Sequence, residues 1–136
     1  MTLIDTHAHI YYDDYSNRID DVISAATDNG VEKIISIGVD LKSSEECIKL
    51  AEKYEPVYAT CGIHPHEADK APKRYLYELE QFYEHPKVVA VGEIGLDYHY
   101  DFSDRKTQRT LYHEQLEMAK SLGLPAVVHC RESDDD

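Results

Sequence analysis

The sequence predicts an α/β fold in which parallel strands alternate with helices. Short apolar runs recur roughly every 30 residues, a spacing typical of βαβ units. Between these runs, apolar residues lie three or four positions apart, as on one face of a helix. The runs are continuously apolar rather than alternating, which is expected for parallel strands buried on both faces.

Two strand–helix units are expected in the first part of the chain. The first strand is expected over 3–6 and the second over 33–37. A helix is expected over 16–29 and ends before Gly30, its apolar face formed by Ile19, Val22, Ile23 and Ala26. Ser43 and Glu46 have the spacing of a capping box, so a second helix is expected to begin there. Its apolar face is formed by Cys47, Leu50, Ala51 and Tyr54.

Three further strands and two further helices follow the same alternation. The strands are expected over 56–61, 88–93 and 125–129. A helix over 73–84 is expected to turn Leu76, Leu79 and Tyr83 inward, and another is expected from Asp104 to before Gly123. Because glycine and tyrosine are frequent over 94–101, that stretch is predicted to be a loop.

Length and charge limit the classes of protein that fit. A chain of 136 residues is long enough for one domain with a real core. Its 27 acidic and 14 basic residues give a formal net charge of -13, which argues against a broad basic surface for non-specific nucleic-acid binding. A nucleic-acid substrate stays possible, because bound divalent metals neutralise phosphates locally.

The predicted location is the cytoplasm, without association with a membrane. The chain starts without a basic-apolar signal sequence and contains no apolar run long enough to span a bilayer. The cysteines Cys47, Cys61 and Cys130 lie far apart and are odd in number. They are predicted to be buried, reduced thiols.

Metal-binding residue types lie at or just past the ends of the predicted strands: His7, His9, His64, Glu93 and His129. The carboxyl ends of parallel strands form the edge where active sites of α/β proteins are built. Asp5, His7 and His9 also alternate along an extended strand and so share one face. A bare His-x-His is commonly a pair of surface histidines, but the repeated strand-end placement favours a site.

These residue types suit a centre of divalent metal ions. Imidazoles from His7, His9 and His129 are nitrogen ligands, and the carboxylate of Glu93 can bridge two ions. Zn, Mn, Fe or Mg would fit such a set. Two ions about 4 Å apart can activate a water and stabilise both the attacking and the leaving oxygen in phosphodiester hydrolysis.

Other polar and aromatic residues have two interpretations each. Arg131 can hold a phosphate by a bidentate contact or be an ordinary loop arginine. His64 can contact the substrate or support a ligand, or be a loop histidine shaped by Pro65. Tyr98 and Tyr100 can stack on a base, although packing within a loop is the commoner role of such residues. The remaining histidines are expected at the surface: His66, His85, His99 and His113.

Four segments together resemble the signatures of the TatD-type metal-dependent deoxyribonucleases. They are Asp-Thr-His-Ala-His over 5–9, Gly-Ile-His-Pro-His over 62–66, Val-Gly-Glu-Ile-Gly-Leu-Asp-Tyr over 91–98 and Val-His-Cys-Arg-Glu over 128–132. The resemblance implies a (β/α)8 TIM barrel and metal-dependent hydrolysis of DNA, often as a 3'-exonuclease on single strands. It implies two divalent ions, such as Mg, Mn or Zn. The implied ligands are His7, His9, His129 and a bridging, catalytic Glu93, with His64 and Arg131 contacting the substrate.

The sequence is shorter than such a barrel, which needs roughly 250 residues. Residues 1–136 are therefore expected to form the N-terminal portion of one barrel domain, with about five strands. The family's remaining His and Asp ligands, on later strands, have no counterpart. The chain is therefore expected to hold one ion with His7, His9 and Glu93, whereas a second ion would have only Glu93 and His129. Open sheet edges also predict self-association through the exposed half-barrel surface.

Two alternatives stay open at this point. The chain could be a non-catalytic module that binds a metal or a partner. It could also be another metal-dependent hydrolase, an amidohydrolase or a phosphoesterase, because those families also begin with His-x-His. Many amidohydrolases use a modified lysine on the fourth strand as the bridging ligand, and the presence of Glu93 there favours the nuclease family.

Overall fold

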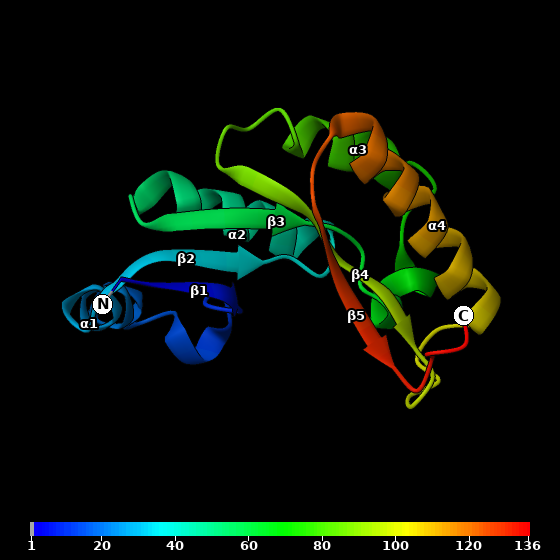
Figure 1. The fold of residues 1–136 in the computed structure, drawn as a ribbon, viewed down its shortest axis with the longest axis horizontal. Coiled ribbons are helices and arrows are strands. Elements are labelled where there is room, and N and C mark those ends of the chain that lie inside the picture. The colour runs from blue at the N-terminus through cyan, green and yellow to red at the C-terminus, as the bar shows by residue number, and fades with distance from the viewer. Residues whose placement is uncertain (1) are drawn as a thin grey trace.

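The computed structural model describes residues 2–136, which form one parallel sheet that curls into half of a barrel (Figure 1). The five strands are neighbours in chain order: β1 (Leu3–Ala8), β2 (Val31–Ile37), β3 (Val57–Cys61), β4 (Val88–Asp97) and β5 (Ala126–Arg131). The α/β, half-barrel fold predicted from sequence is confirmed. That residues 1–136 are one portion of a single barrel domain stays a prediction, and Met1 lies outside the described residues.

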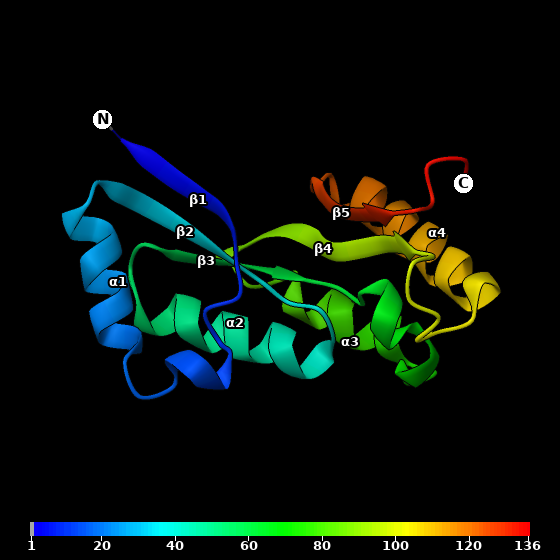
Figure 2. The same ribbon diagram turned by 90° about the horizontal axis from the view of Figure 1, so that it is seen from below.

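The helices lie along the outer side of the curled sheet (Figure 2). They are α1 (Ile19–Asp28), α2 (Leu41–Lys53), α3 (Tyr75–Phe82) and α4 (Arg105–Leu122), with short 3-10 helices η1 (Asp13–Tyr15) and η2 (Pro65–Lys70). Every crossover from one strand to the next returns the chain to the same end of the sheet. The carboxyl ends of all five strands therefore lie at the same end of the sheet.

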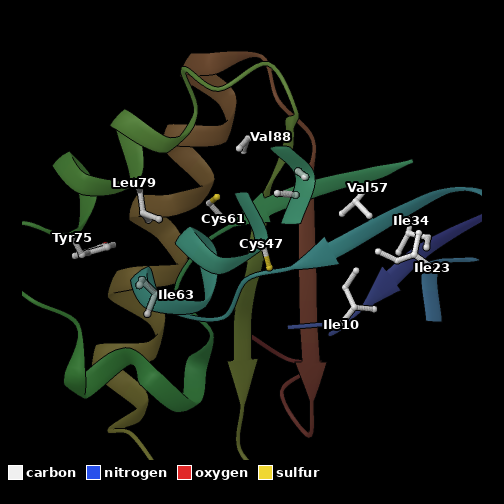
Figure 3. Packing of buried hydrophobic residues seen from close by; sticks show 12 residues of the cluster. Ile10, Ile23, Ile34, Cys47, Val57, Cys61, Ile63, Tyr75, Leu79 and Val88 are labelled. Atoms are coloured by element: carbon white, nitrogen blue, oxygen red, sulfur yellow. The ribbon is translucent and has the colours of Figure 1, made fainter. Parts of the chain in front are cut away.

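The main core lies between the sheet and the helices that cover it (Figure 3). Cys47 and Ala51 of α2 are fully buried against Val57 and Ala59 of β3, and Leu79 of α3 joins them. A smaller cluster joins β4 to α4 through Val91, Ile94 and Ala119. Burial of these side chains fixes the strands, and with them the residues at the strand ends.

Helix α2 begins earlier than the sequence predicts. Asp40 is its N-cap: the Asp40 carboxylate accepts a hydrogen bond from the Ser43 amide at 2.7 Å, and the Ser43 hydroxyl accepts one from the Asp40 amide at 3.0 Å. The capping box is therefore Asp40 with Ser43, and the expected box of Ser43 with Glu46 is wrong. The carboxylate reaches the free amides of the first turn, and the serine completes the reciprocal bond.

Strand β4 is longer than predicted, so the expected loop over 94–101 is wrong up to Asp97. Ile94 and Leu96 are buried, and β5 pairs with β4 as far as Asp97 with Arg131. Gly95 has φ 137°, and a Cβ there would collide with the carbonyl oxygen of His129. Gly95 therefore does not form a turn; it allows β4 and β5 to approach each other closely.

The two edge strands leave apolar side chains in contact with solvent. Leu3 and Ile4 of β1 are 46% and 54% exposed, and Val128 of β5 is 49% exposed. Cys130 of β5 is exposed as well, so the expectation of three buried thiols is wrong for this residue, while Cys47 and Cys61 are buried and free. Cys130 lies on β5, which is an edge strand among the described residues.

Among residues 2–136, no helix combines the length and the apolarity needed to cross a membrane. The cytoplasmic location stays a prediction.

Candidate metal centre and substrate pocket

A cavity of about 370 Å³ lies at the end of the sheet where the carboxyl ends of the strands meet. The cavity is lined by all six residues that the resemblance implies as metal ligands or substrate contacts: His7, His9, His64, Glu93, His129 and Arg131. His7 lies in β1 and His9 just after it, His64 follows β3, Glu93 lies within β4, and His129 and Arg131 lie in β5. The structure thus brings together residues that are up to 124 positions apart in sequence, counting from His7 to Arg131.

Glu93 occupies the centre of the site. Register between β4 and β5 is irregular from Val91 to Ile94, and the Glu93 amide donates to the Gly38 carbonyl at 2.7 Å. Such a bulge redirects a side chain away from the regular pleat. One carboxylate oxygen, Oε2, lies 3.5 Å from Nε2 of His7, while Oε1 lies 3.3 Å from Nδ1 of His129. The two oxygens therefore face opposite groups of histidines.

The ring of His9 is oriented by the backbone behind it. Its Nδ1 lies 3.1 Å from the carbonyl oxygen of Ile37, which can only accept a hydrogen bond, so Nδ1 carries the proton. The lone pair is then on Nε2, which lies 3.9 Å from Oε2 of Glu93. Burial lowers the pKa of His9, although Glu93 opposes this effect. His9 is therefore neutral near pH 7, in the form that ligates metals.

The ring of His129 is oriented in the same way by Asp97. Nε2 of His129 lies 2.9 Å from Oδ2 of Asp97, so Nε2 donates its proton and Nδ1 keeps its lone pair on the side of Glu93. Burial would raise the pKa of Asp97, but the Tyr100 amide and the rings of His129 and His66 outweigh it and lower that pKa to about 2. Asp97 is thus an ionised acceptor at neutral pH.

The sequence did not predict that Asp97 would contact the candidate ligands. Its side chain is fully buried, and Oδ1 accepts hydrogen bonds from the amides of His99 and Tyr100, both at 3.1 Å. Oδ2 contacts His66 and His129. The available signal was an acidic residue at the end of an apolar run, and the wrong boundary of β4 concealed it.

The expectation that His66 lies on the surface is also wrong. His66 lines the cavity, and its Nε2 lies 2.8 Å from Oδ2 of Asp97. Pro65 starts η2 directly after His64, and this turn brings the next side chain back over the strand ends. His99 and His113 are exposed as expected, and His85 is half-buried beside Glu52.

His64 has a different environment from the other histidines. Its Nδ1 accepts the amide proton of His66 at 3.1 Å, so a neutral His64 carries its proton on Nε2. Burial, with the rings of His129 and His66, lowers its pKa to about 3. This ring therefore offers a neutral N–H donor, which suits a contact with a substrate oxygen.

Helix α4 fixes the backbone beneath the site with two buried glutamines one heptad apart. The amide of Gln108 bonds both the N–H and the C=O of Asp97, at 2.9 and 3.1 Å. The amide of Gln115 bonds both the N–H and the C=O of Ile63, at 2.7 and 3.2 Å. The two glutamine side chains thus fix the backbone at Asp97 and directly before His64.

The donor atoms fit divalent cations. Two groups share Glu93, namely His7 with His9 and His64 with His129, and the candidate ligand atoms in each group lie within 4.8 Å of one another. Separations of 3.3 to 3.9 Å between histidine nitrogens and Glu93 oxygens are long for hydrogen bonds. They match two atoms bound to one ion at about 2.0–2.2 Å each. Because the Nδ1 of His64 is already engaged, His129 is the better nitrogen ligand of the second group.

Arg131 lies at the rim of the cavity. Its Nη1 is 3.9 Å from Oδ2 of Asp97, and its guanidinium group is 5.6 Å from the centre of the Tyr100 ring. About half of the Arg131 side chain is exposed to solvent. The guanidinium group is therefore held in place and accessible, as a phosphate contact requires.

Comparison with known proteins decides the family. The profile of the family described as TatD related DNase matches residues 4–136. The chain belongs to this family. It is 35% identical over 134 residues to the uncharacterized metal-dependent hydrolase YabD of Bacillus subtilis, covering 98% of this chain and 52% of that protein. It is 32% identical to the 3'-5' ssDNA/RNA exonuclease TatD of Escherichia coli, covering 96% of this chain and 50% of that protein.

Solved structures of the TatD family agree. YjjV of Escherichia coli, a TatD homologue, superposes with a TM-score of 0.91 at 38% identity, covering 98% of this chain and 52% of that structure. A TatD family hydrolase from Entamoeba histolytica gives the same TM-score at 32% identity, covering 100% and 52%. The chain thus spans about half the length of these relatives.

Proposed function

We propose that this site hydrolyses phosphodiester bonds of single-stranded DNA from the 3' end, with divalent metal ions as cofactors. The observation that carries the proposal is the placement of Glu93, whose two oxygens face separate groups of histidines. A relative at 32% identity is named as a 3'-5' ssDNA/RNA exonuclease, and another at 35% is named as a metal-dependent hydrolase. Both names support the same class of reaction.

The proposed ligands are His7, His9 and Glu93 for the first ion and Glu93 with His129 for the second. Mg, Mn or Zn bound there would supply a Lewis acid that activates water and neutralises phosphate charge. The first ion has three protein ligands and the second has two, so we expect the first to bind more tightly. Asp97 holds the imidazole of His129 in the tautomer that a ligand needs.

Two side chains are proposed to bind the substrate phosphate. Arg131 lies at the rim with an accessible, fixed guanidinium group. His64 presents its Nε2–H from within the cavity and stays neutral because of its low pKa. A charged and a neutral donor would attract and orient one phosphate locally, which does not require the broad basic surface that this acidic chain lacks.

Hydrolysis of a 3'-labelled single-stranded DNA with added Mn or Mg tests the proposal. We expect cleavage by the wild type and a loss of about 100- to 1000-fold in Glu93→Gln, a size typical of the loss of one electrostatic group in an active site. Glu80→Gln is the matched control, because Glu80 is an exposed residue of α3. It should keep the wild-type rate.

Two results would contradict this function. Equal cleavage by the wild type and Glu93→Gln would assign the activity to something other than this site. A folded wild type that binds Mn but cleaves no DNA would leave the non-catalytic metal-binding module as the better description.

A further inference from the structure

An exposed pair of aromatic rings lies beside the candidate metal centre. Tyr100 and Phe102 are 42% and 62% exposed, and their rings stack with centroids 5.1 Å apart and an interplanar angle of 10°. Both follow the carboxyl end of β4, in the segment that leads to α4. An exposed aromatic pair costs hydration free energy, so such a pair on a protein surface indicates a binding role.

This pair is continuous with the cavity. The ring of His66, which lines the cavity, meets both rings edge-on, at 5.7 Å from Tyr100 and 4.9 Å from Phe102. Arg131 also lines the cavity, with its guanidinium group 5.6 Å from the Tyr100 ring. An aromatic surface, a cation and the metal ligands therefore adjoin one another.

The segment that carries the pair is anchored at both ends. The amide of Tyr100 donates to the buried carboxylate of Asp97 at 3.1 Å. The buried hydroxyl of Ser103 donates to the carbonyl of His66 at 3.0 Å and accepts from the amide of Asp69 at 3.1 Å. The rings are thus held in position before any ligand binds, which lowers the entropic cost of binding.

Tyr98 is engaged elsewhere, although its position in the sequence suggested a base contact. The guanidinium group of Arg105 lies 4.4 Å from its ring centre, and its hydroxyl donates to Asp136 at 2.7 Å. Arg109 contacts the same hydroxyl at 3.1 Å. The free aromatic surface therefore belongs to Tyr100, which the sequence indicated, and to Phe102, which it did not.

We propose that Tyr100 and Phe102 form a stacking platform for one nucleobase of a single-stranded substrate. Because each ring covers one face of the other and Arg131 lies over Tyr100, the base stacks on the free face of Phe102. A base inside a duplex has both faces covered by its neighbours, so the platform selects an unpaired base. This inference rests on the proposed nucleic-acid substrate.

Binding of two oligonucleotides that differ only in their bases tests the platform. The probes are fluorescein-labelled hexathymidylate and the matched abasic hexamer, both with phosphorothioate linkages that resist hydrolysis, titrated in Mg²⁺ and followed by anisotropy. Thymines stack weakly on one another, so stacking within the probe competes little with stacking of a base on the protein. Stacking of one base is worth about 5- to 150-fold in affinity, so we expect the wild type to prefer the base-containing hexamer by that factor.

Replacing a residue of the platform should remove this preference without changing the contribution of the phosphates to the affinity. Phe102→Leu is expected to bind both hexamers with the wild-type affinity for the abasic one. Tyr77→Leu is the matched control, because Tyr77 is exposed on α3 with Arg74 4.9 Å from its ring centre, as in the platform. It should keep the full preference.

Three results would overturn the platform: no binding of either hexamer, equal binding of both by the wild type, or an unchanged preference in Phe102→Leu. The hydrolase proposal is tested separately, by cleavage of unmodified DNA. A base preference without cleavage of unmodified DNA would keep the platform and refute the nuclease. Cleavage without a base preference would do the reverse.

Discussion

At the scale of single residues, Asp97 determines which nitrogen of His129 is free. Replacing it by asparagine removes the charge that holds the proton on Nε2 of His129. Loss of such a carboxylate behind a histidine ligand typically costs about 10- to 100-fold in metal affinity. We expect Asp97→Asn to weaken the second Mn by that factor and to leave the first unchanged, as measured by titration calorimetry.

Asp101→Asn serves as the control for this substitution. Asp101 is exposed and lies 3.6 Å from Arg105, outside the cavity. It should bind both ions like the wild type. An Asp97→Asn protein with unchanged affinity for two ions would show that His129 is not held as a ligand in this way.

The three thiols should differ in reactivity for the same local reasons. Burial raises the pKa of Cys47 to about 12 and raises that of Cys61 further, while Cys130 is exposed. A raised pKa keeps the folded thiol protonated at pH 8, and the protonated form is the unreactive one. We expect Ellman's reagent to modify one thiol rapidly in the native protein and three in denaturant. Rapid modification of all three in the native state would contradict the packing of α2 against β3.

At the residue scale, the sequence predicts which side chains come together. His7, His9, Glu93 and His129 line one cavity, as expected, because each residue type is informative by itself and each lies near the end of an apolar run. Their role as metal ligands stays a prediction. The roles of Asp97 and His66 depend on the contact between them, at 2.8 Å, across 31 positions of sequence. Such a contact is set by tertiary packing, and no local spacing encodes it.

At the scale of elements, β4 shows why boundaries are harder to predict than existence. The apolar run over 88–93 indicates a strand, but Gly92 and Gly95 suggest its end. In the structure they allow the bulge that redirects Glu93 and the close approach of β5. A glycine can end a strand at the protein surface, and it can also let two strands approach closely in a core. Only the presence of the neighbouring strand distinguishes these two cases.

Gly95→Ala tests this interpretation of β4. A positive φ costs a non-glycine residue about 1–2 kcal/mol, and overpacking against His129 adds about 1–3 kcal/mol. The expected loss in the free energy of unfolding is therefore about 2–5 kcal/mol, measured by urea denaturation. Gly123→Ala is the comparison without overpacking, since Gly123 has φ 66° and a Cβ there would meet nothing within 4 Å. Equal losses in the two variants would contradict the close approach of β4 and β5.

At the scale of the whole molecule, the half-barrel leaves an apolar surface at its two open edges. Leu3, Ile4 and Val128 are about half exposed, and β1 and β5 each have a hydrogen-bonded strand neighbour on one side only within residues 2–136. Unpaired edges with apolar side chains favour association with another chain. We propose that a second copy covers them, because the two edges of one molecule present parallel strands with the same kind of apolar surface.

Sedimentation velocity tests this association. We expect the wild type to dimerise or associate further at micromolar concentrations, and Ile4→Glu to raise the dissociation constant by about tenfold or more, since a charge would have to be desolvated at the contact. Tyr77→Glu is the control, because Tyr77 is 54% exposed on the helical side of the sheet, where no contact is expected. A wild type that stays monomeric at high concentration would contradict the proposal. A weakened association in Tyr77→Glu instead would assign the contact to the helices rather than to the open edges.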